Sequence, residues 1–128
     1  MSTPSQTQRY TLLRLSSVSL SVQSGPAWKG YFGLQFSARG RVPDGASGWL
    51  ALVEYLPAGT DGSEQARELV RAVAGPLPLA ALSPSRTMTH LGALRWPESA
   101  RPERLRARAW IESNSGALLA VAAERCGP

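Results

Sequence analysis

Polar and apolar residues alternate along much of this chain, as they do in β-strands with one face buried. The clearest alternation covers residues 31–42, where one face carries Phe32, Leu34, Phe36, Ala38 and Val42. Residues 104–113 alternate in the same way. Residues 49–56 are apolar on both faces except at Glu54, a pattern typical of a central strand. These three stretches are the strongest β predictions in the sequence.

Three weaker strands complete the prediction. Residues 9–23 form a long expected strand whose apolar parity changes at Ser16 and Ser17, which indicates a β-bulge or a bend between two sheets. Less regular strands are expected at 86–96 and 117–125. Glycine, proline, asparagine and aspartate punctuate the chain between strands and predict turns or loops. These connections cover residues 24–30, 42–48, 97–103 and 114–116.

The stretch after the third expected strand has helical spacing. Asp61 followed by Glu64 fits a capping box, and Gly75 with Pro76 is suited to ending a helix. The apolar stripe consists of Ala66, Leu69, Val70 and Val73. We therefore predict an amphipathic helix over 62–74. The expected fold is mainly β (α+β by element count): an antiparallel β-sandwich or barrel of about six strands, with this helix inserted after the third.

Length and composition narrow the class of protein. The chain has 128 residues, of which 43% are hydrophobic, enough for a single packed domain. We expect residues 1–8 to be a flexible N-terminus and 9–128 to form one β-rich domain. No apolar run approaches the ~20 residues of a membrane helix, and the first residues lack a signal-peptide pattern. The expected location is therefore cytoplasmic.

Basic residues provide the strongest candidate for a binding site. The net charge is +5, and Lys29 is the sole lysine among 14 basic residues. Arginines alternating with an aromatic residue on one strand face can follow phosphates and stack a base. The candidate residues for binding an anionic partner are Arg104, Arg106, Arg108 and Trp110, with Arg39, Arg41 and Tyr31 behind them. A solvated face, or an edge strand protected by charge, would have the same pattern.

Candidates for catalysis are few. Glu54 interrupts an apolar strand, so it is either a buried acid with a raised pKa, a residue at an edge or rim position, or the partner of an arginine. His90 is the sole histidine and Cys126 the sole cysteine, too few soft ligands for a metal cluster. Cys126 fits a small apolar filler better than a reactive thiol. Glycine-rich phosphate loops and a nucleophile elbow are missing from the sequence, so we expect no catalytic residues, cofactor or metal.

One segment suggests an enzyme family. The stretch from Leu91 to Cys126 contains a strand, a proline-bearing loop and then two strands around a glycine turn. It resembles the end of hotdog-fold dehydratases and thioesterases, over about a quarter of the chain. The resemblance implies acyl-group chemistry and a long helix wrapped by a sheet. The expected helix at 62–74 is short, and the catalytic His or acid of that family has no clear equivalent.

The lack of recognisable catalytic motifs and the expected two-faced strands together favour a non-catalytic role. Sites for chemistry are missing, whereas two-faced strands and exposed aromatics are typical of interfaces. Trp28, in a predicted loop, either contacts a partner or folds back over the domain. We predict a β-rich binding or assembly module that acts through surface recognition or self-association, with a protein or a second copy as partner. The alternatives are an arginine-dependent protein that binds single-stranded nucleic acid, and a hotdog-like acyl thioesterase or dehydratase.

Overall fold

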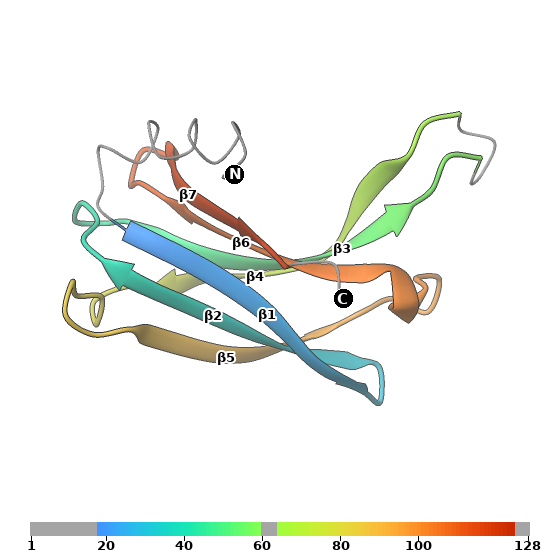
Figure 1. The fold of residues 1–128 in the computed structure, drawn as a ribbon, viewed down its shortest axis with the longest axis horizontal. Helices are drawn as coiled ribbons and strands as arrows, with labels where there is room; N and C mark the ends of the chain where they lie inside the picture. Colours follow the sequence, from blue (N-terminus) through green and yellow to red (C-terminus); the bar gives the residue numbers. More distant parts are fainter. Residues whose placement is uncertain (1–17, 60–63, 125–128) are drawn as a thin grey trace, which may run out of the picture.

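The computed structural model describes residues 18–59 and 64–124 of the chain. Within this part, seven strands and one short 3-10 turn follow one another (Figure 1). The strands are β1 (Val18–Trp28), β2 (Tyr31–Gly40), β3 (Ser47–Leu56), β4 (Arg67–Pro78), β5 (Met88–Arg95), β6 (Leu105–Glu112) and β7 (Leu118–Ala123). The 3-10 turn η3 (Pro102–Arg104) leads directly into β6.

The strands form two antiparallel sheets that pack face to face as a sandwich. One sheet has the order β1-β2-β5 and the other the order β4-β3-β6-β7. Figure 1 shows the two layers, and β1 packs against β6 and β7 across the sandwich. The chain changes sheets after β2, after β4 and after β5. Crossings of this Greek-key kind are found in immunoglobulin-like sandwiches. The sheets do not close into a barrel, so the sandwich alternative of the prediction is confirmed.

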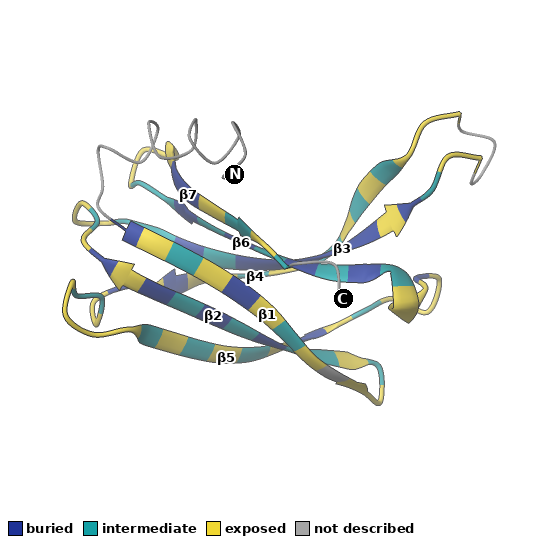
Figure 2. Ribbon diagram, viewed as in Figure 1, coloured by how far each residue is buried: buried dark blue, intermediate teal, exposed yellow. Residues whose placement is uncertain are grey.

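Alternating side chains from the two inner faces fill the core. The largest fully buried apolar side chains are Phe36 on β2, Leu50 and Leu52 on β3, and Ile111 on β6. Figure 2 shows the resulting bands of buried and exposed residues along each strand. The strands predicted at 31–42, 49–56 and 104–113 are confirmed in type and differ by a few residues in length.

The predicted helix over 62–74 is wrong. The described part of the chain has no α-helix, and residues 67–78 form β4, which pairs antiparallel with β3. The register shifts between Leu52 and Val53, which leaves Arg71 as an extra residue on β4. This bulge shifts the strand alternation by one residue, so that the apolar positions coincide with helical spacing. Tertiary pairing with β3 then overrides the local pattern.

Other differences concern strand ends and residues outside the described part. β4 brings the count to seven strands, and β1 extends through the predicted 24–30 loop to Trp28. The predicted N-terminal segment 1–8, the bend at Ser16 and Ser17, Asp61 and Cys126 all lie outside the described residues. Over 18–59 and 64–124, no helix is long and apolar enough to cross a membrane.

Candidate interaction surface

The outer face of the β4-β3-β6-β7 sheet carries a concentration of exposed apolar side chains. Strand register places Trp49, Trp110 and Val121 in one row across three strands. Val73, Ala51, Arg108 and Ala123 form the next row. We call this surface the four-stranded outer face and define its apolar part as Trp49, Tyr55, Val70, Val73, Trp110, Leu118 and Val121. Five of these seven are large hydrophobic residues classed as exposed.

Two tryptophans form the rigid centre of this face. The Trp49 and Trp110 rings stack nearly parallel, with centroids 6.1 Å apart and planes 9° from parallel. The Trp110 indole Nε1 donates a hydrogen bond of 2.8 Å to Oε1 of Glu112, which orients that ring. Gly75 lies directly against Trp49, where a Cβ would come within 2.5 Å of the ring. The pair is therefore held by β4 on one side and by a carboxylate on the other.

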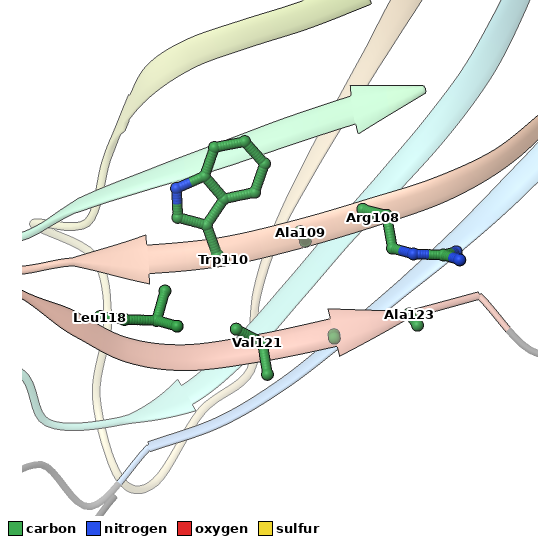
Figure 3. Close-up of a pocket in the computed structure, with 7 residues that line it drawn as sticks. Arg108, Ala109, Trp110, Leu118, Val121 and Ala123 are labelled. Atoms are coloured by element: carbon green, nitrogen blue, oxygen red, sulfur yellow. The ribbon is translucent and has the colours of Figure 1, made fainter. Parts of the chain in front are cut away.

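A shallow groove runs along the β6–β7 side of the same face. It has a volume of about 430 Å³ and is lined mainly by Arg108, Trp110, Leu118, Val121 and Ala123. Figure 3 shows these side chains on two adjacent strands, with the Trp110 ring standing above β6. The lining is apolar apart from Arg108. Such a groove suits the apolar side chains of a partner better than a small polar substrate.

The arginines of this face are engaged within the domain. The Arg108 guanidinium forms an ion pair of 2.5 Å with Glu68 on β4. Because β3 lies between β6 and β4, this ion pair links two strands that are not adjacent in the sheet. Arg106 donates hydrogen bonds to the backbone carbonyls of Glu103 and Leu105.

The structure separates the seven residues predicted to bind an anionic partner. Arg106, Arg108 and Trp110 lie together on the four-stranded outer face. Arg104 lies before β6, at the end of η3. Tyr31 and Arg39 lie near opposite ends of β2 in the other sheet, and Arg41 follows that strand. Arg39 donates from Nε to the Pro84 carbonyl oxygen at 2.8 Å.

Glu54 is a buried acid, but it is paired. Its side chain is 2% exposed on the inner side of β3. Arg71, the extra residue at the β4 bulge, donates from Nε to Glu54 Oε1 at 2.7 Å, and its NH2 nitrogen lies 2.6 Å from the same oxygen. The backbone N–H of Arg101 donates to Oε2 at 3.2 Å. The bulge thus directs an arginine to a carboxylate that would otherwise be buried without a counter-charge.

These partners decide the protonation of Glu54. Burial by itself raises the pKa of the carboxyl group. The hydrogen bonds from Arg71 and Arg101, together with the positive charges of Arg71 and Arg104, outweigh burial and lower the pKa below its ordinary value. The raised pKa expected of a buried acid is therefore wrong, and the arginine-partner alternative is confirmed. Glu54 is a carboxylate at neutral pH and joins β3, β4 and the loop before β6.

The remaining candidates for chemistry are His90 and Cys126. His90 is half-buried on β5, where Phe36 is its cross-strand partner. Among the described residues, no cluster of three or more His, Cys, Asp or Glu side chains could hold a metal ion. Cys126 lies beyond the described part of the chain.

The sequence analysis did not identify the exposed apolar residues that β4 and β7 contribute to the four-stranded outer face. Val70 and Val73 were assigned to the buried stripe of a helix, whereas they lie 65% and 48% exposed on β4. Leu118 and Val121 belong to a short strand that is apolar on both faces, so alternation gives no clue to its outer side. The β-branched Val70 and Val73 were a signal for a strand.

Comparisons with known proteins found no relative for this chain: no family model, no curated protein and no solved structure matches it.

Proposed function

We propose that this protein is a non-catalytic binding or assembly module, and that the four-stranded outer face is its contact surface. The observation that carries the proposal is that five exposed apolar side chains and a stacked tryptophan pair lie on the same outer face of one sheet. A gathering of large exposed apolar side chains on one face is typical of interfaces. Tryptophan, tyrosine and arginine are also enriched among residues that dominate binding energy.

The first partner to test is a second copy of this chain. Two copies facing each other across a two-fold axis would bury the apolar part of this face on both copies. In such a dimer, the same surface patch of each copy contacts the other copy. Arg106 donates two hydrogen bonds within the domain and Arg108 pairs with Glu68, so both would enter such an interface with part of their donor capacity already satisfied.

Sedimentation velocity over a range of concentrations tests this proposal. We expect the native chain to associate, and Val73→Lys to weaken association at least tenfold because it places a charge within the contact surface. The matched control is Leu91→Lys, since Leu91 is 71% exposed but lies on β5 of the other sheet. The control variant should associate like the native chain. A native chain that stays monomeric, or equal loss in both variants, would contradict self-association through this face.

Binding of single-stranded nucleic acid is the second candidate, favoured by the presence of Arg106, Arg108 and Trp110 on one face. A phosphate at Arg108 would compete with the carboxylate of Glu68, whereas Arg106 donates only to backbone carbonyls. Titration of a labelled oligonucleotide at ~50 and ~200 mM salt separates the two functions, because several phosphate contacts would make affinity fall by orders of magnitude. Binding that is insensitive to salt, or no binding, would exclude this candidate.

The acyl-enzyme alternative has little support. Hotdog enzymes need a long helix within a wrapped sheet, and the part of the chain that the structure describes has two packed sheets and no α-helix. Glu54, the best candidate acid, is occupied by Arg71 and Arg101.

A further inference from the structure

The β1–β2 hairpin ends in an unusual turn. Trp28 pairs with Tyr31, and the two residues between them, Lys29 and Gly30, have φ angles of 50° and 84°. Two positive φ angles in a two-residue loop are the signature of a type I′ turn, which favours asparagine or glycine at its first position. A lysine at that position costs backbone strain, and a strained residue in an exposed place suggests a function for its side chain.

The side chains around this turn are aromatic and cationic. Trp28 is 69% exposed and Tyr31 is 43% exposed. The Lys29 ammonium lies 4.7 Å from the centre of the Trp28 ring, and the Arg95 guanidinium lies 6.0 Å from the centre of the Tyr31 ring. Arg95 is the cross-strand partner of Tyr31 on β5. We call Trp28, Lys29, Tyr31 and Arg95 the hairpin tip.

The strands of the hairpin itself carry no acidic residue, and the acid that comes nearest in sequence to the hairpin tip is Glu98, three residues after Arg95. The hairpin tip forms the end of the two-stranded hairpin at the lower right of the ribbon in Figure 1. Residues 18–40, which include the whole hairpin, contain no aspartate or glutamate. Tryptophan and tyrosine concentrate at the level of lipid headgroups, and nearby lysine and arginine are attracted to anionic lipids. The tip therefore presents rings and cations together at one exposed point.

We propose that the hairpin tip binds the surface of an anionic membrane, with the two rings at headgroup level and the two cations at lipid phosphates or carboxylates. This goes beyond the proposed function and is independent of it, because the tip belongs to the β1-β2-β5 sheet. A nucleic-acid strand is a poorer match. Binding of single strands relies on a basic groove that follows several phosphates, whereas the tip offers two cations at one point.

Flotation with vesicles tests the proposal on the full chain. The probe is phosphatidylcholine vesicles with about 30 mol % phosphatidylserine, compared with pure phosphatidylcholine. We expect binding to the anionic vesicles, loss of binding in about 0.5 M NaCl, and a blue shift of tryptophan fluorescence. Trp28→Ser should lower the partition coefficient at least tenfold. Arg95→Gln should lower it about fivefold, the change equivalent to about 1 kcal/mol per cation.

Two further variants separate binding from folding. Lys29→Asn relieves the strain of the turn, so it should raise or preserve the melting temperature while lowering vesicle binding about fivefold. Leu91→Ser, at an exposed apolar position on the same sheet, should leave vesicle binding unchanged. The proposal is overturned if anionic vesicles do not bind the native chain, if Leu91→Ser is as damaging as Trp28→Ser, or if the tip binds an oligonucleotide and not the vesicles.

Discussion

Glu54 and Arg71 join three segments that are distant in sequence. The carboxylate on β3 binds the guanidinium from the β4 bulge and the backbone N–H of Arg101. Both charges are withdrawn from water, although Arg71 remains 23% exposed. Removing one partner of such a pair leaves the other as a buried charge without a counter-charge. The loss of stability is then larger than the net stabilisation that the intact pair provides.

Arg71→Ala should therefore lower the free energy of unfolding by about 3 kcal/mol. This value is at the low end of the range for buried ion pairs that lose one partner, because Arg71 keeps some contact with water. Urea denaturation measures this change. The matched control is Glu68→Ala, which breaks the pair between Arg108 and a carboxylate that is 44% exposed and should cost less than about 1 kcal/mol. Equal costs for the two variants would show that Glu54 is not held as the structure describes.

The lowered pKa of Glu54 predicts how stability depends on pH. The native state favours the charged carboxylate, so the stabilisation is present above the ordinary pKa of about 4.5 and is lost as pH falls through the lower native value. In Glu54→Gln this part of the pH dependence should vanish. We therefore expect the stability difference between the native chain and Glu54→Gln to shrink below about pH 4.5 in urea titrations. A difference that grows on acidification would indicate a raised pKa instead.

At the scale of elements, β4 shows where local pattern and tertiary structure diverge. The capping-box pattern of Asp61 and Glu64 precedes it, and its own sequence continues a helical apolar stripe. The bulge at Arg71 produces the same spacing in a strand, because one extra residue shifts the alternation. Strands without such an irregularity between apolar positions, such as β2 and β6, were predictable from alternation alone.

Gly75 controls how β4 meets the tryptophan pair. Its φ of 150° is unfavourable for other residues, and a Cβ would lie 2.5 Å from Trp49 and 3.0 Å from the Gly48 carbonyl oxygen. Gly75→Ala should therefore cost about 2 kcal/mol of stability and weaken the near-ultraviolet circular dichroism of the stacked rings. Gly33→Ala is the control, since a Cβ there meets no atom within 4 Å. An unchanged tryptophan signal in Gly75→Ala would contradict the close contact.

For the whole molecule, the sequence was sufficient to predict the class of fold but not the surface. Alternation in β2 and β6 and the continuous apolar run of β3 indicated sheets with one shared core, and the burial of those strands follows these patterns. Which outer faces would be adjacent depends on strand order, which alternation does not encode. Hence Arg39 and Arg106 were expected to extend one patch, yet they lie on different sheets. The apolar flanks around Trp49 and Trp110 emerged only from the pairing of β3 with β4 and β6.

We propose that the four-stranded outer face makes contact with a partner, first of all a second copy of the chain. The most direct measurement follows amide chemical shifts of the native chain by NMR during dilution from high to low micromolar concentration. We predict that shifts change at outward positions of β3, β4, β6 and β7, centred on Trp110 and Val121, and stay constant on β1, β2 and β5. Shifts that do not depend on concentration, or changes centred on the three-stranded sheet, would contradict the claim.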